Sequence, residues 1–169
     1  MAGGTSQLGA AIASRLAGQG DHVTLFGRNS RNGSFANEIG VTFIEGDAAV
    51  ATERASLVDH LGVHPDGLHG LVVVFSAVYT ARLSETTDEA WDAVLEANVI
   101  APILVAQACL PLLNDGGSIV FIGSGTAQWP EMELGAYSVA KRMLERMAQV
   151  LAMEVEPFEE RTSETSRIV

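Results

Sequence analysis

Apolar residues recur along the chain with two periodicities, one typical of helices and one typical of strands. Leu8, Ile12 and Leu16 lie at helical spacing and are followed by glycines, which predicts a first helix near residues 8–18. Short runs rich in β-branched and aromatic residues predict strands. The expected strands are 22–26, 41–45, 71–75 and 118–122, and the expected helices are 8–18, 51–61, 88–113 and 136–155.

The alternation of strands and helices predicts an α/β layered fold with a mostly parallel sheet. The run 71–75 is continuously apolar, as in a strand covered on both faces. A length of 169 residues fits one domain. We expect residues 1–156 to form the folded core and the polar, aperiodic segment 157–169 to form a loose tail.

Composition and charge narrow the classes of function. The chain is 47% hydrophobic and 18% charged, which is typical of a globular protein, and its net charge of −11 argues against binding to nucleic acid or anionic membranes. Cys109 is the single cysteine, so we expect a reducing, cytoplasmic setting. No membrane-spanning run is expected. His60, His64 and His69 lie without a ligand pattern, so no metal site is expected.

One set of residues points to proton transfer. Tyr137 and Lys141 are four apart in an expected helix, which places phenol and ammonium on one face, and Ser124 follows the expected strand 118–122. A phenol is a weak base at neutral pH, and a nearby ammonium stabilises its phenolate form. Such a set can pass a proton to or from a C–O group while a cofactor supplies the hydride. A surface helix that carries Tyr and Lys by chance is the alternative.

These residues resemble the short-chain dehydrogenase/reductase family. That family combines a Rossmann nucleotide site with a Tyr-x-x-x-Lys helix, an upstream serine, and an asparagine on the preceding helix, whose place Asn98 takes here. The resemblance implies that Tyr137 is the general acid/base and that Ser124 positions the substrate oxygen. It also implies that Lys141 supports the tyrosine and holds the ribose, and that Asn98 supports Lys141.

The glycine-rich segment at the start of the chain resembles the family's dinucleotide fingerprint in part. A glycine-rich turn that opens a helix can bind phosphate through free N–H groups and the helix dipole. Gly3 and Gly9 match the first and last glycines of Gly-x-x-x-Gly-x-Gly, while Gln7 or, in a related pattern, Ser6 stands at the middle position. The expected cofactor contacts here are Gly3, Thr5, Ser6, Gln7, Leu8 and Gly9.

Further cofactor contacts are implied after three strands. Arg28 lies 19 residues past Gly9, where a basic side chain suits the 2′-phosphate of NADP; a solvated loop arginine is the alternative. Asp47 takes the place of an aspartate beside adenine. Ala77 matches the alanine of the family's Asn-Asn-Ala-Gly, although its neighbours differ. With Tyr137 and Lys141, these complete the expected cofactor site, for NADP with NAD possible.

Compared with the family, the chain is shorter at both ends. Only Met1 and Ala2 precede Gly3, in place of a first strand, and the family's later strands have no counterpart. We therefore expect an incomplete Rossmann-like, doubly wound sheet, weakened or split between 22–26 and 71–75, with a loosely anchored glycine loop. The tail Arg167–Val169 is too short to replace a strand. Asn98, Ser124, Tyr137 and Lys141 should still converge.

Two functions follow as expectations. The first is an NAD(P)-dependent oxidoreductase that interconverts a small-molecule carbonyl and an alcohol, in a homo-oligomer. The second is a catalytically silent interaction module that retains the fold core and the helices through which the family dimerises. The apolar residues considered for that interface are Ile100, Ile103, Leu104, Val105, Leu110 and the segment 143–153.

Overall fold

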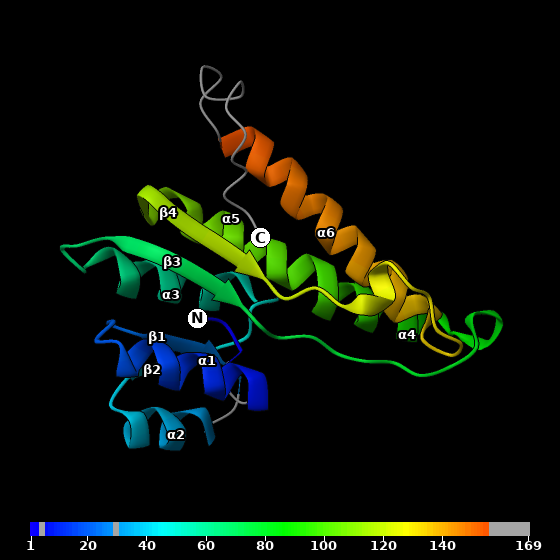
Figure 1. Ribbon diagram of the computed structural model, residues 1–169, viewed down its shortest axis with the longest axis horizontal. Coiled ribbons are helices and arrows are strands. Elements are labelled where there is room, and N and C mark those ends of the chain that lie inside the picture. The colour runs from blue at the N-terminus through cyan, green and yellow to red at the C-terminus, as the bar shows by residue number, and fades with distance from the viewer. Residues whose placement is uncertain (4–5, 29–30, 156–169) are drawn as a thin grey trace.

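Four parallel strands lie at the centre of the molecule as two separate pairs (Figure 1). The computed structural model describes residues 1–3, 6–28 and 31–155, and the structural statements below concern those residues. β1 (Thr24–Gly27) pairs with β2 (Thr42–Glu45), and β3 (Leu68–Val73) pairs with β4 (Leu113–Phe121). The predicted α/β fold with parallel strands is confirmed, as is the predicted split between its two halves.

Among the described residues, Ala2 is the one whose backbone bridges both strand pairs. It forms isolated parallel bridges to Phe26 of β1 and to Val73 of β3. Its N–H donates to the carbonyl of Val72 over 2.8 Å, and its carbonyl accepts from the N–H of Val74 over 2.8 Å. The chain start therefore fills one end of the expected gap, and Figure 1 shows it between β1 and β3.

Three helices match the apolar periodicity of the sequence closely. They are α1 (Gln7–Gly18), α3 (Ala51–Gly62) and α6 (Gly135–Val155). Ser6 caps α1, because its Oγ accepts from the N–H of Gly9 over 3.0 Å. The strands differ more from expectation: β3 begins and ends earlier than 71–75, and β4 begins at Leu113 rather than at 118.

One helix, α2 (Arg31–Ile39), was not predicted from the sequence. Its sequence contains asparagine, glycine and serine, all weak helix formers. Tertiary packing compensates, because the buried Ala36 packs with Ala13 of α1 and Leu25 of β1. Gly40, with φ of 71°, takes the left-handed conformation that commonly ends a helix.

The expected helix 88–113 is divided by a π-helical turn. α4 (Asp88–Leu95) leads into the π turn Glu96–Ile100, which continues into α5 (Ala101–Cys109) and a short 3₁₀ turn, Leu110–Leu112. Pro102 has no N–H to donate to the carbonyl of Asn98, four residues before it. The N–H of Ala101 donates to the carbonyl of Glu96, five residues before it, which is the π-helical pattern. Asn98 therefore sits at a defined irregularity of the helix.

The stretch Asp88–Leu112 is long and apolar enough, by length and composition alone, to cross a membrane. This corrects the sequence-based statement that no run reaches that length. Half of its most apolar window is buried inside the protein. It contributes Val105, Ala106 and Cys109 to the main hydrophobic cluster, together with Leu71 and Ile119 of β3 and β4. We interpret it as a core helix.

Candidate functional site

Tyr137 and Lys141 lie one above the other near the start of α6. The Nζ of Lys141 is 5.8 Å from the centroid of the Tyr137 ring. Tyr137 is 9% exposed and Lys141 2% exposed, so both side chains are largely withdrawn from water. Ala136 and Ala140 of the same helix pack against Val94 and Val99, which draws α6 against the π turn that carries Asn98.

Lys141 also contacts the strand that leads to Ser124. Its Nζ donates to the carbonyl of Ile122 over 2.9 Å. Burial lowers the pKa of Lys141, because removal from water disfavours the ammonium form. Ser124 follows two residues later, half-buried, and its Oγ lies 2.9 Å from the Oγ1 of Thr126. Lys141 thus connects the tyrosine helix to the serine loop.

Asn98 is fully buried and makes three hydrogen bonds through its side-chain amide. Its Nδ2 donates to the carbonyl of Ala77 over 2.7 Å and to that of Val94 over 2.9 Å. Its Oδ1 accepts from the N–H of Ala77 over 3.3 Å. The expected role of Asn98 was to support Lys141. Its hydrogen bonds instead connect it to Val94 of α4 and to the loop after β3, which holds the expected cofactor residue Ala77.

Five of the expected cofactor residues line one cavity of about 770 Å³ at the carboxyl ends of the strands. This volume lies within the range of small-molecule sites. The cavity is bordered by both strand pairs and by one face of α4 and the π turn. The five residues are Gly3, Ser6, Arg28, Asp47 and Ala77, and the walls also include Phe75 and Ala93, Glu96, Ala97 and Ala101.

The glycine loop reaches this cavity at two positions. Gly3 has φ of 97°, and a Cβ added there would lie 2.6 Å from the backbone nitrogen of Phe75, so only glycine fits. Ser6 lines the cavity as the cap of α1, whose first turn holds no acidic residue. Thr5 lies outside the described residues. Gln7 and Leu8 are exposed and Gly9 is buried, and none of these three is among the described lining residues.

Arg28 and Asp47 form an ion pair at the edge of the cavity. The Nη1 of Arg28 is 3.5 Å from the Oδ2 of Asp47. The other carboxylate oxygen of Asp47 accepts from the N–H of Ala49 over 2.9 Å, in the turn before α3. The N–H of Asp47 donates to the carboxylate of Glu53. The two expected cofactor residues therefore contact each other.

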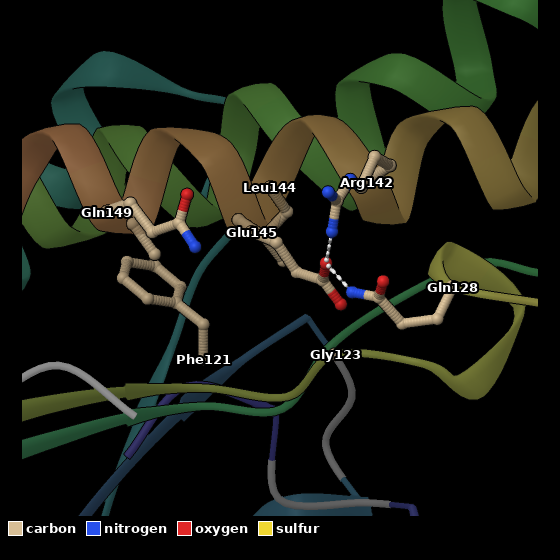
Figure 2. A pocket seen from close by; sticks show the side chains of 8 residues that line it. Phe121, Gly123, Gln128, Arg142, Leu144, Glu145 and Gln149 are labelled. Carbon is tan, nitrogen blue, oxygen red and sulfur yellow. Dashed lines mark hydrogen bonds and ion pairs between the residues drawn. The ribbon is translucent and has the colours of Figure 1, made fainter.

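A second, smaller cavity of about 270 Å³ lies between the end of β4 and α6. Figure 2 shows that three of its polar side chains, Arg142, Glu145 and Gln128, contact one another. The carboxylate of Glu145 accepts from Arg142 over 2.9 Å and from Gln128 over 2.8 Å. Phe121 and Leu144 supply apolar wall. None of the expected site residues lines this cavity.

Several residues of the main cavity were missed by sequence reasoning. Ala93, Glu96, Ala97 and Ala101 line it at positions separated by three and four residues, so they share one helical face. That spacing was visible in the sequence, but no role was predicted for this face. Phe75 was noted as a departure from the family motif, whereas its backbone packs against Gly3.

Comparison with known proteins identifies relatives along almost the whole chain. A family model described as enoyl-(acyl carrier protein) reductase matches residues 2–162. Dehydrogenase/reductase SDR family member 4 of Pongo abelii is 32% identical over 169 residues, covering 90% of this chain and 58% of its own length. Human dehydrogenase/reductase SDR family member 2, mitochondrial, is 32% identical, and the match covers 92% of this chain and 58% of the human protein. The chain thus spans somewhat more than half the length of these relatives.

Solved structures agree with this assignment. A short-chain dehydrogenase from Shigella flexneri 2a str. 301, complexed with NADP, superposes with a TM-score of 0.86 at 27% identity, covering 99% of this chain and 71% of its own. A dehydrogenase/reductase from Sinorhizobium meliloti 1021 gives 0.84 at 30% identity, covering 91% and 64%. The fold is therefore an incomplete Rossmann fold, and the chain belongs to the short-chain dehydrogenase/reductase family of oxidoreductases.

Proposed function

We propose that this chain carries the catalytic core of an NAD(P)-dependent oxidoreductase that interconverts a small-molecule carbonyl and an alcohol. The observation that carries the proposal is the buried Lys141, whose Nζ lies 5.8 Å from the Tyr137 ring centroid and donates to Ile122. Placing a lysine ammonium in a site that is 2% exposed costs desolvation free energy. This cost is explained if the Lys141 ammonium supports proton transfer by Tyr137.

Each side chain has a proposed task. In the reductive direction the phenol Oη of Tyr137 donates its proton to the substrate oxygen as the carbonyl becomes an alcohol; in the oxidative direction it takes the proton back. Lys141 stabilises the phenolate that remains and holds the ribose. Ser124 hydrogen-bonds the substrate oxygen. Asn98 supports this arrangement from the π turn and keeps Ala77 in place.

The residues of the main cavity fit a nicotinamide dinucleotide, which supplies or accepts the hydride when bound. Ser6 and the start of α1 suit the pyrophosphate, because a helix N-terminus favours an anion. Gly3 and Ala77 contribute small residues to the cavity wall. Arg28 suits a 2′-phosphate, so NADP is the proposed cofactor, with NAD as the alternative. Two solved relatives are complexed with NADP or NADPH.

Fluorescence titration with NADPH and NADH tests the proposal. We expect the purified chain to bind at least one of them, and to oxidise it in the presence of a carbonyl from a chemically varied panel. Tyr137→Phe should retain cofactor binding and lose turnover, since only the phenolic hydroxyl group is removed. A chain that binds neither cofactor would contradict the proposed activity.

A second candidate function is self-association through α6. Val139, Met143 and Val150 are each more than 40% exposed and lie on one face of that helix, and Ile100 of the π turn is 45% exposed. Ile103 and Val105, considered for the same interface, are buried in the core instead. Light scattering at micromolar concentration tests this candidate, and a monomer would count against it. A cytoplasmic location also remains a proposal, to be tested by cell fractionation.

A further inference from the structure

We infer that Asp47 sets the preference of this chain between a cofactor with a 2′-phosphate and one with a 2′-hydroxyl, by holding the guanidinium of Arg28. This inference rests on the proposed nicotinamide site. It goes further by assigning discrimination between the two cofactors to the pair Arg28 and Asp47, in which Asp47 weakens the binding of the 2′-phosphate.

Strand register brings the two residues together. In β1 and β2, Gly27 is level with Glu45, so Arg28 and Asp47 both leave their strands at the same edge of the sheet. The N–H of Gly46 donates to the carbonyl of Gly27 over 3.0 Å, which fixes the separation of the two strand ends. A Cβ on Gly46 would lie 2.5 Å from the Phe26 ring, so this close approach depends on glycine.

The charge balance of the cavity makes the pair important. Among the described lining residues, Arg28 is the single cation, while Glu45, Asp47 and Glu96 are acidic. Among the described lining residues, the 2′-phosphate of a bound cofactor therefore has one guanidinium to pair with, and Asp47 already contacts that guanidinium. A 2′-hydroxyl carries no charge, so a cofactor with a 2′-hydroxyl does not need Arg28 to leave Asp47.

The geometry allows Arg28 to exchange partners. Its side chain is 77% exposed, whereas that of Asp47 is 34% exposed and is anchored through Ala49. A phosphate would thus draw Arg28 away from a carboxylate that stays in place. Measured couplings of exposed ion pairs correspond to about a twofold to fivefold change in an equilibrium constant. We expect Asp47 to weaken NADPH binding within that range.

The variant Asp47→Asn tests this directly, because it removes the charge and keeps the Oδ1 acceptor for the N–H of Ala49. We expect its Kd for NADPH to fall about twofold to fivefold, with the Kd for NADH changed by less than twofold. The gain should shrink at 0.5 M salt, since the interactions involved are exposed and screened. Glu96→Gln is the matched control, because it removes one charge from the part of the cavity wall that the π turn forms.

A double-mutant cycle separates the pairing from simple repulsion. In the Arg28→Ala background, Asp47→Asn should give little gain in NADPH affinity, since no guanidinium remains to be released. An equal gain in both backgrounds, or an equal gain from Glu96→Gln, would overturn the inference in favour of general charge repulsion. So would an unchanged ratio of NADPH to NADH affinity in Asp47→Asn.

The outcomes also separate this inference from the proposed function. If the parent chain binds neither cofactor, the proposed function fails and the inference fails with it. If the parent chain binds a cofactor but the ratio does not respond to Asp47, only the inference fails. If Asp47→Asn proves unfolded by circular dichroism, Arg28→Ala decides: it must weaken NADPH binding and leave NADH binding unchanged, and an equal effect on both would overturn the inference.

Discussion

Asn98 and Ala77 are joined by two hydrogen bonds that run in opposite directions. The amide of Asn98 donates to the carbonyl of Ala77 over 2.7 Å and accepts from its N–H over 3.3 Å. The two residues are 21 positions apart in the sequence, and one lies in a π-helical turn while the other lies in the loop after β3. This contact fixes a cavity wall against the helix that packs on α6.

Replacing Asn98 with alanine should therefore affect both stability and binding. The change removes the side-chain partner of the N–H and carbonyl of Ala77 and of the carbonyl of Val94, which we expect to cost about 1–3 kcal/mol in unfolding free energy. NADPH affinity should fall as well, because Ala77 lines the cavity. Urea unfolding and fluorescence titration measure the two effects.

The matched control is Asn114→Ala, which removes an exposed amide that donates to Asp66 over 2.6 Å. Its cost should stay below about 1 kcal/mol, since water can replace an exposed partner. Equal losses of unfolding free energy in the two variants would show that the buried contact between Asn98 and Ala77 stabilises the protein no more than an exposed hydrogen bond does.

Gly3 should be intolerant of any side chain. Gly3→Ala places a methyl group 2.6 Å from the backbone nitrogen of Phe75 in a residue whose φ is 97°. Gly20 has a similar φ of 93° with open space around it, so Gly20→Ala isolates the backbone strain, which we expect to cost about 1–2 kcal/mol. Gly3→Ala should cost about 1–3 kcal/mol more. Equal losses in urea unfolding would contradict this steric account.

Lys141→Met should separate stability from chemistry. Methionine keeps most of the length and apolar volume of the side chain and removes a buried ammonium, so we expect the unfolding free energy to change by less than about 1.5 kcal/mol. Turnover of any carbonyl that the parent chain reduces should fall by at least about 100-fold, since proton transfer loses its supporting cation. Rates that fall only in proportion to the folded fraction would indicate a structural role.

In the chain that begins at Met1, stability should rise between pH 6 and pH 8. The Met1 ammonium donates to the carbonyl of Thr24 over 2.6 Å, and burial lowers its pKa from 8.0 to about 6. The unfolded chain therefore binds more protons in this window, and deprotonation as pH rises removes the cost of burying the charge. The gain should reach about 2–3 kcal/mol at most. Acetylating the amine should abolish this slope, and a slope that persists would contradict its assignment to Met1.

Local pattern was enough to predict much of the fold and part of the site. Tyr137 and Lys141 share one turn of a helix, so their proximity follows from spacing alone. α1, α3 and α6 have regular apolar periodicity and were expected near their observed bounds. The helix α2 was missed because Ala36 is buried through tertiary contacts that its weak local propensity does not reveal.

Other features depend on relationships that no short stretch contains. The Arg28–Asp47 pair arises from the parallel register of β1 and β2, and sequence reasoning assigned the two residues to different parts of a cofactor. The contact between Asn98 and Ala77 likewise joins distant segments. The π turn left one local sign, Pro102, whose missing N–H interrupts the regular ladder.

The backbone of Ala2 bridges both strand pairs, so we expect β1, β2, α1 and α2 to behave as a smaller unit of unfolding and the rest of the molecule as a second unit. The cluster around Ala13, Leu25 and Ala36 lies within the smaller unit, whereas Phe26 of β1 also packs in the main cluster with Leu71 and Val73 of β3. The main cavity has walls from both, Arg28 and Asp47 on one side and Phe75 and Ala77 on the other. A ligand that contacts both walls would act as a thermodynamic cross-link. Without ligand the smaller unit should open first in hydrogen exchange, and with ligand both units should exchange together.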